Sequence, residues 1–416
     1  MPGDQRPFSP PSAARPRADA RRDPGEGHRA ATPLELLYDL TLVVAFSVAG
    51  SQFAHALAGD HIGSGLLSFL FCMFAIVWAW QAYTWFASAY DTDDWAFRIA
   101  TLAQMLGVTI LALGITNLFR EMEEGRLDYR AIVIGYVIMR LSMISLWVRA
   151  ARNDPEHRGA LLANVVVIGA AQIGWIFTAF ADLPTGFLLG LMAMLYLIEV
   201  GGTWLITVRY GAFPWHPHHI AERYGLLAII TFGEVVLGTT TAVEAVKVEN
   251  GWTLDAAVLA VAGITMVVGM WWVYFAVPNG EVLRHRRRYG VRWAYAHVVI
   301  YSTITATGAG LHAVAYSIEH HSELGPTATA VTVAVPLGLY LVALFTMFHL
   351  ILPGRDPFHR TLLGLTAATI AGAVALAATG VSIAWPILVL TAAPWITAVG
   401  FEVRGHRHIA DRLSEL

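Results

Sequence analysis

Residues 65–88 read GLLSFLFCMFAIVWAWQAYTWFAS, a run of 24 residues without a charged side chain. A helix rises about 1.5 Å per residue, so about 20 residues cross the roughly 30 Å hydrocarbon core of a bilayer. The run is long enough and apolar enough to be one transmembrane helix. In the whole chain 56% of residues are hydrophobic and 14% are charged, whereas soluble domains have about 25% charged residues. The composition therefore indicates an integral membrane protein.

Eleven more apolar runs of similar length occur along the chain. They predict an all-α polytopic membrane protein with about twelve transmembrane helices. The last two runs are separated only by a short break at Thr379-Gly380. Together with the first run, the expected spans are 34–58, 65–88, 97–118, 131–150, 160–181, 185–208, 222–243, 254–277, 293–315, 327–351, 361–379 and 382–402.

The basic residues are unevenly distributed between the two sides of this arrangement. Of 27 Lys and Arg residues, 22 fall on the side of the N-terminus, four fall in the opposite loops, and Arg140 falls within a span. Cytoplasmic loops of membrane proteins are enriched in Lys and Arg. We therefore expect both termini to be cytoplasmic. The N-terminal 1–30 has six Arg and no apolar stretch, which predicts a disordered basic tail, and a short cytoplasmic tail is expected at 406–416.

A short motif indicates an internal repeat. Asp154-Pro-Glu-His-Arg158 after the fourth span recurs 202 residues later as Asp356-Pro-Phe-His-Arg360 after the tenth. Six spans per half is an even number, so we expect two parallel six-helix repeats, 31–208 and 209–405, related by an axis along the membrane normal. The motif itself is typical of a helix cap with basic interface anchors, since Asp and Pro favour a helix start. A role in gating is the alternative.

Ionisable residues within the spans are the candidate functional residues, because charges in the bilayer are costly and usually face a protein interior. Glu35 and Asp39 lie on one face of the first span, and Glu234 lies about 18 Å deeper in the seventh span than Glu222. We expect these four acids and Arg223 to line one polar cavity between the first and seventh helices. Glu199 in the sixth span is a further candidate binding residue. In the alternative interpretation, Glu35, Asp39, Glu222 and Arg223 only bond helix ends together.

Other polar residues carry weaker expectations. The histidine clusters at 215–219 and 319–321 lack the i, i+4 spacing or Cys partners of a dependable zinc site, so no metal and no cofactor are expected. His297, His312 and His349 are interpreted as packing residues. The single cysteine, Cys72, excludes a disulfide within the chain. The net charge of -3 argues against a nucleic-acid partner.

Two stretches resemble a known family. Residues 32–46, TPLELLYDLTLVVAF, and 219–234, HIAERYGLLAIITFGE, resemble the two signatures of the bacterial low-temperature-requirement A family. The resemblance covers about 30–405. It departs at Tyr38, which follows Leu37 where the family usually has paired aromatic residues. The resemblance implies a bacterial plasma membrane protein, and the family is named for a growth phenotype in the cold without an established activity.

Three classes of function remain open. A secondary transporter of a small molecule or ion, which could be coupled to protons, fits the repeat and the buried carboxylates. An ATP motor is not expected, because no G-x-x-x-x-G-K-[ST] motif occurs. A membrane enzyme acting on a hydrophobic substrate would rely on Glu and Asp acid–base chemistry, since G-x-S-x-G and H-E-x-x-H are absent. A membrane scaffold or sensor is the third alternative, and no catalytic residue is assigned.

Overall fold

The computed structural model describes residues 29–351 and 357–405. Twelve of the described helices are long and apolar enough to cross a membrane, which confirms the predicted all-α polytopic fold. Each of them overlaps one of the expected spans. The helix of the seventh span begins at Pro217, five residues before the expected position. Asp356 of the second Asp-Pro motif lies outside the described residues, and so does the C-terminal tail.

The spanning helices follow one another with short connections. One short helix, α9 (Asn279–His285), and a 3-10 turn (Arg287–Tyr289) lie between the eighth and ninth spans, and the π-helical segment Phe401–Gly405 follows the last. The sequence did not predict these three segments. The spanning helices are α1 (Pro33–Ala58), α2 (Ile62–Tyr90), α3 (Trp95–Glu123), α4 (Arg130–Asn153), α5 (Arg158–Phe180), α6 (Thr185–Tyr210), α7 (Pro217–Asn250), α8 (Leu254–Phe275), α10 (Gly290–Ile318), α11 (Pro326–Ile351), α12 (Pro357–Ala377) and α13 (Ala384–Gly400).

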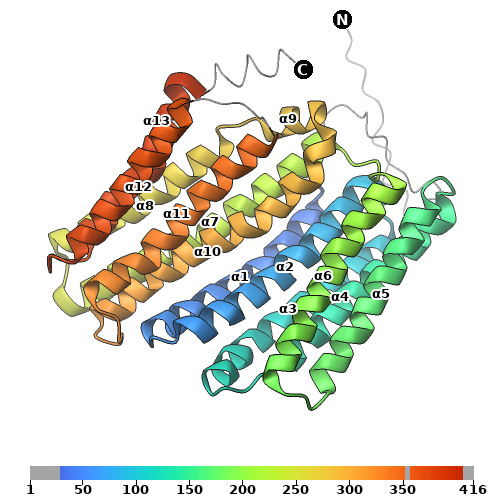
Figure 1. Ribbon diagram of the computed structural model, residues 1–416, viewed down its shortest axis with the longest axis horizontal. Helices are drawn as coiled ribbons and strands as arrows, with labels where there is room; N and C mark the ends of the chain where they lie inside the picture. Colours follow the sequence, from blue (N-terminus) through green and yellow to red (C-terminus); the bar gives the residue numbers. More distant parts are fainter. Residues whose placement is uncertain (1–28, 352–356, 406–416) are drawn as a thin grey trace, which may run out of the picture.

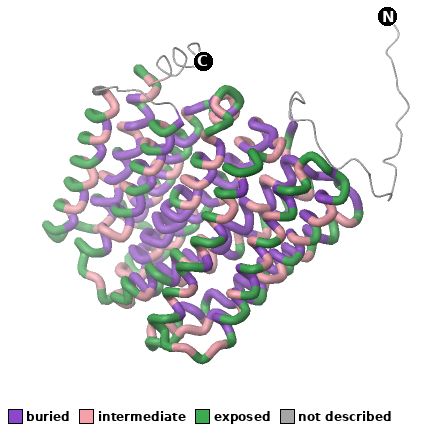
Figure 2. Tube along the Cα trace, turned by 45° about the vertical axis from the view of Figure 1, so that its right-hand side comes forward, coloured by how far each residue is buried: buried purple, intermediate pink, exposed green. Residues whose placement is uncertain are grey.

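The centre of the molecule is formed by α1, α2, α7 and α10, with α3–α6 on one side and α8 and α11–α13 on the other (Figure 1). Of the most apolar 18-residue stretch of each spanning helix, 83% is buried inside the protein in α10, compared with 22% in α6 and in α12. Buried residues therefore concentrate along the central helices, and exposed ones along the periphery and at the helix ends (Figure 2). The outer helices α6 and α12 present most of their surface to lipid.

Small residues allow α10 to take its central position. Residues 302–310 of this helix read STITATGAG. A Cβ atom on Gly308 would lie 2.5 Å from the carbonyl oxygen of Glu234 in α7, so only glycine permits this approach. In membranes, where lipid is as apolar as the helices, such close backbone contact is a main source of helix association.

The two halves have similar internal packing. In the first half α1 packs against α2 and α3, and α3 packs against α4; in the second half α7 packs against α8 and α10, and α10 packs against α11. The contacts between the halves are unequal, because α10 lies along α1 while α3 makes no comparable contact with α7 among the described residues. The parallel repeat stays a prediction that this internal packing supports.

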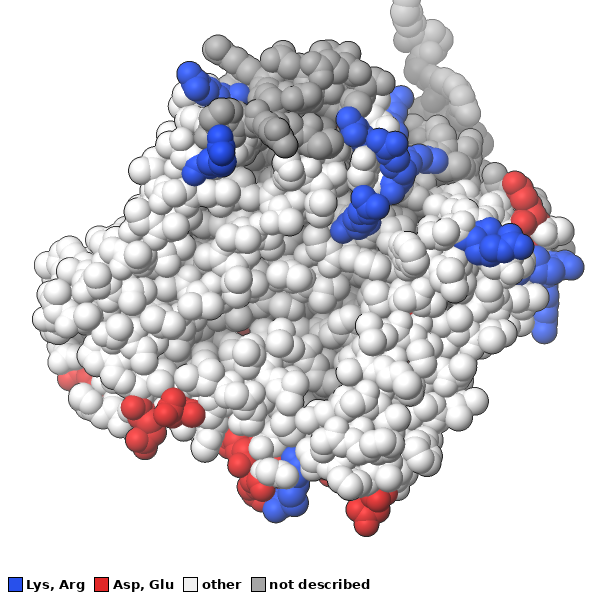
Figure 3. All heavy atoms as spheres, in the orientation of Figure 1, with Lys and Arg blue, Asp and Glu red and all other residues white. Residues whose placement is uncertain are grey.

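Charged residues occupy the two ends of the helices. Most of the visible Lys and Arg lie at one end and most of the visible Asp and Glu at the other, with a broad band between them that is almost free of charge on this face (Figure 3). Such a band is what a protein surrounded by lipid requires.

Candidate functional site

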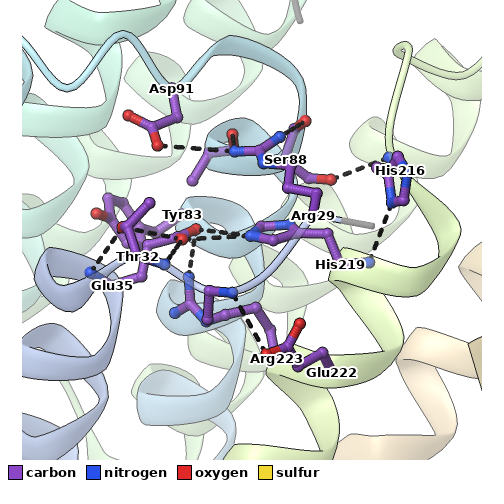
Figure 4. Close-up of polar contacts among 12 residues, drawn as sticks. Arg29, Thr32, Glu35, Tyr83, Ser88, Asp91, His216, His219, Glu222 and Arg223 are labelled. Carbon is purple, nitrogen blue, oxygen red and sulfur yellow. Dashed lines mark hydrogen bonds and ion pairs between the residues drawn. The ribbon is translucent and has the colours of Figure 1, made fainter. Parts of the chain in front are cut away.

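The first buried polar group joins α1 to α7 near the helix ends that carry the basic residues (Figure 4). We call it the Arg223 cluster; its members are Glu35, Asp39, Trp80, His219 and Arg223. The Arg223 guanidinium lies 2.6 Å from Glu35 through Nη1. It also donates two hydrogen bonds to Asp39, from Nη2 at 2.7 Å and from Nε at 3.2 Å. All three side chains have 0% exposure.

Neighbouring residues fix the two carboxylates of the cluster. Thr32 and Glu35 form a capping box at the start of α1, and the Thr32 amide donates to Glu35 Oε2 at 2.8 Å. His219 Nε2 lies 3.2 Å from the same carboxylate. Trp80 of α2 donates its indole N–H to Asp39 at 2.7 Å. Each acid is therefore held by a helix cap or by a neighbouring helix as well as by Arg223.

The residues just before α1 also make polar contacts near the cluster. Arg29 donates to the backbone carbonyls of Ser88 and Ala87 at the end of α2. Glu222 is half-buried, and it accepts a hydrogen bond from the amide of Ala31 at 3.4 Å rather than binding Arg223. These contacts connect the segment before α1 with α2 and α7.

The second group lies near the middle of the central helices. Glu234 of α7 is 6% exposed and accepts a short hydrogen bond from the Ser47 hydroxyl of α1. Gly50 and Gly308 border this residue. A Cβ on Gly50 would lie 3.3 Å from Glu234 Oε2, and a Cβ on Gly308 would lie 2.5 Å from the Glu234 carbonyl oxygen. No cation is paired with Glu234 in the part of the chain that the structure describes. The carboxyl group is thus isolated from charge at the junction of α1, α7 and α10.

The third group lies within the first half. Glu199 of α6 and Arg140 of α4 form an ion pair of 2.8 Å, and both side chains are 1% exposed. Tyr136 donates to Glu199 Oε2 at 2.6 Å. The other carboxylate oxygen accepts from the Trp175 indole at 2.9 Å and from Gln172 at 3.3 Å. This carboxylate has a full set of donors from α4 and α5.

A cavity of about 100 Å³ reaches the Arg140–Glu199 pair. It extends from this pair toward the end of the molecule where α2 and α6 finish and α10 begins. Most of its wall is apolar, with seven aromatic and six aliphatic residues among the nineteen that line it. Its polar lining consists of Gln81, Arg140, Asn164, Glu199, Thr203 and Thr207.

The structure brings together only part of the predicted site. Glu35, Asp39 and Arg223 meet, whereas Glu222 binds the segment before α1, and Glu234 and Glu199 lie in separate groups. Sequence reasoning missed Trp80 and His219 as partners of the carboxylates, and it did not pair Arg140 with Glu199. One signal could have found this pair, because Arg140 is the only Lys or Arg more than two residues inside an expected span and Glu199 is an acid deep in another span of the same half.

Histidines of the 215–219 cluster contact other groups in the described structure. His219 faces Glu35, and the His216 ring accepts a hydrogen bond from the His219 amide. Among the described residues, Asp154, Glu156 and His157 lie close enough together to hold a cation. Asp154 already accepts hydrogen bonds from Tyr90 and from the His157 amide. Asp154 is the C-cap residue of α4, and α5 begins at Arg158 with His157 as its N-cap residue and no side-chain cap. The predicted helix cap by Asp154 and Pro155 is therefore wrong at this copy of the motif.

Comparison with known proteins places the chain in a family. The family model described as bacterial low temperature requirement A protein matches residues 30–394. An uncharacterized protein of Rhizobium meliloti (strain 1021) is 26% identical over 313 residues, which are 70% of this chain and 70% of that protein. No solved structure matches the chain. Since the family model covers most of its length, this chain belongs to the bacterial low temperature requirement A (LtrA) family.

Proposed function

We propose that this protein is a secondary transporter coupled to protons, with its coupling site between α1 and α7. The observation that carries the proposal is Glu234, a buried carboxyl group near mid-membrane whose described partner is the neutral Ser47 hydroxyl. An unpaired charge at this depth costs at least about 2.5 kcal/mol. A carboxyl group that exchanges a proton there can couple proton movement to a change in the packing of α1, α7 and α10.

The Arg223 cluster supports the same proposal. Two carboxylates face one guanidinium, so one additional proton, on His219 or on a carboxyl group, makes the cluster neutral. In a site without water, gaining or losing a proton changes the electrostatic attraction between the helices much more than it would in water, where charges are screened. The cluster joins the two halves, and its charge state would therefore control how firmly they are held together at this end.

We further propose that the basic end of the molecule faces the cytoplasm, with both termini inside and the protein in the bacterial plasma membrane. The concentration of Lys and Arg at one end supports this orientation (Figure 3). The similar packing of the segments 31–208 and 209–405 supports two parallel six-helix repeats. No further partner besides lipid and a small substrate is proposed.

The test is flux in sealed proteoliposomes with a broad metabolite pool and an imposed pH gradient. The wild type is expected to move solute along with protons, and Glu234→Gln is expected to abolish this movement while still folding. Glu244→Gln is the matched control, since this exposed acid pairs only with Lys247 near the end of α7.

Two outcomes would contradict the proposal. Normal proton-coupled flux in Glu234→Gln would exclude this residue as the coupling group. Absence of flux in folded wild-type protein under every gradient would remove the transporter assignment and favour a scaffold or sensor.

A further inference from the structure

We infer that the cavity in the first half binds a small organic carboxylate with an aromatic or otherwise flat apolar body, which competes with Glu199 for Arg140. The inference deepens the proposed function and rests on it only for the transport that would follow binding. It concerns a different group of residues from the coupling site between α1 and α7.

The guanidinium of Arg140 has donors to spare. A single nitrogen, Nη2, donates to both Tyr136 and Glu199, at 2.6 Å and 2.8 Å. The Nε–H is buried and has no hydrogen-bond partner among the residues that the structure describes. Arginine carries five N–H donors in a planar fork that fits a carboxylate through two parallel bonds. Arg140 can therefore exchange its one-nitrogen contact with Glu199 for a two-nitrogen contact with a substrate carboxylate.

The walls of the cavity select the rest of the ligand. Trp78, Trp85, Phe86, Trp147 and Tyr295 contribute rings to its lining. A closed cavity of about 150 Å³ holds benzene. This cavity is smaller, about 100 Å³, but it is open at one side, so a single ring can enter with part of it in the opening. Asn164, which is 1% exposed, lines the same cavity with an unpaired amide oxygen that can accept a hydrogen bond.

Charge balance couples such binding to a proton. The Arg140–Glu199 pair is neutral as a unit, so an incoming carboxylate leaves one net negative charge in a buried site, which is unfavourable. A proton on Glu199 restores neutrality and releases Arg140 for the substrate. The titratable groups that face Glu199 or Arg140 in the described chain are Tyr38 of α1, Tyr136 of α4 and Tyr196 of α6. Trp175 and Gln172 of α5 contribute no charge.

The site also lies between two cavities. A second, apolar cavity of about 320 Å³ is lined by α2, α3 and α6 toward the opposite ends of these helices. Phe74 and Tyr196 line it, with ring centroids 4.2 Å apart. Since Tyr196 lies one turn before Glu199 on α6, movement of this lightly packed helix would displace both residues together.

The experiment measures equilibrium binding of radiolabelled benzoate to purified protein in detergent, where no sealed compartment is required. At pH 6 the wild type is expected to bind benzoate at least tenfold more tightly than the neutral analogue benzamide. Its affinity is expected to fall with rising pH, by up to tenfold per unit, as proton uptake becomes costly. Glu199→Gln is expected to bind benzoate with an affinity that no longer depends on pH.

Arg140→Gln alone would leave Glu199 buried without its partner and could fail to fold. The double variant Arg140→Gln/Glu199→Gln removes both charges and is expected to fold and to lose the preference for benzoate. Glu244→Gln serves as the control with unchanged binding. Equal affinity for benzoate and benzamide in the wild type, or undiminished benzoate binding in the double variant, would overturn the inference. Benzoate binding without flux would leave this site intact and remove only the transporter proposal.

Discussion

Arg223 of α7 holds Asp39 of α1 through two hydrogen bonds in a site with no exposure to solvent. The two residues are separated by 184 positions in the chain and belong to different halves. Planar guanidinium and carboxylate groups in this arrangement fix direction as well as distance. The pair therefore sets the relative position of α1 and α7 at the basic end of the protein.

Replacing Asp39 by Asn should destabilise the protein by about 1.5–3 kcal/mol, because it removes the charged acceptor of two hydrogen bonds from Arg223, while Glu35 still balances the guanidinium charge. Thermal unfolding in detergent, followed by tryptophan fluorescence, measures the effect. Asp93→Asn is the control, since its ion pair with Arg98 is exposed and should contribute little. An equal fall of Tm in both variants would show that burial does not increase the contribution of the Asp39–Arg223 pair to stability.

Replacing Trp80 by Phe should cost about 1.5–3 kcal/mol, because it removes a hydrogen bond of 2.7 Å to the Asp39 carboxylate and keeps most of the ring. The same unfolding assay applies. In the Asp39→Asn background the cost of Trp80→Phe should be smaller, since the charged acceptor is gone. Full additivity of the two substitutions would contradict this coupling.

Replacing Gly308 by Ala should destabilise the protein by about 1–3 kcal/mol, because the new methyl group would lie 2.5 Å from the Glu234 carbonyl oxygen and force α7 and α10 apart. Gly372→Ala in α12 is the matched control, since nothing lies within 4 Å of its added Cβ atom. The control should keep or raise Tm, because Ala favours a helix more than Gly does. Equal stability of the two variants would argue against close packing at Gly308.

Asp94, which caps α3, gives a pH-dependent prediction. Partial burial raises the pKa of its carboxyl group, but the hydrogen bonds from Arg149 and from the Phe97 amide outweigh this and hold the pKa below its ordinary value. A carboxyl group with a lowered folded-state pKa stabilises the protein above the unfolded pKa of about 3.9, and this stabilisation disappears as pH falls through the folded-state value.

Asp94→Asn should therefore have a lower Tm than the wild type at pH 7, and the difference should narrow below about pH 4. Asn retains an N-cap acceptor, so the variant isolates the contribution of the charge. The measurement is Tm of both proteins between pH 7 and pH 3.5. A difference that stays constant across this range would show that the carboxylate charge contributes nothing.

The proposed orientation predicts which loops are reached from outside the cell. The single native cysteine, Cys72, is buried and should not react. A membrane-impermeant maleimide added to intact cells should label His321→Cys, in the exposed connection between α10 and α11. It should label Arg288→Cys, before α10, only after the membrane is permeabilised. The reverse pattern would place the basic end outside.

The twelve spans could be predicted from the sequence because each depends on a local property, the length of an uncharged run relative to the thickness of a bilayer. The same reasoning identified Glu35, Asp39, Glu199, Glu222, Arg223 and Glu234 as unusual, since each lies in or next to such a run. Short segments with no apolar run, such as α9, were not predicted, because nothing in their composition distinguishes them from a loop.

Which of these residues meet was decided only by the tertiary structure. The i, i+4 spacing places Glu35 and Asp39 on one face of α1, but it does not say that Trp80 and His219 complete their contacts. Arg140 and Glu199 pair across 59 positions, and Glu234 stays apart from Arg223 although both lie on α7. The sequence alone determined the helices and the charges that they carry. The partners of those charges depend on how the helices cross, and this depends on close packing at residues such as Gly308 that are far from the charges in the chain.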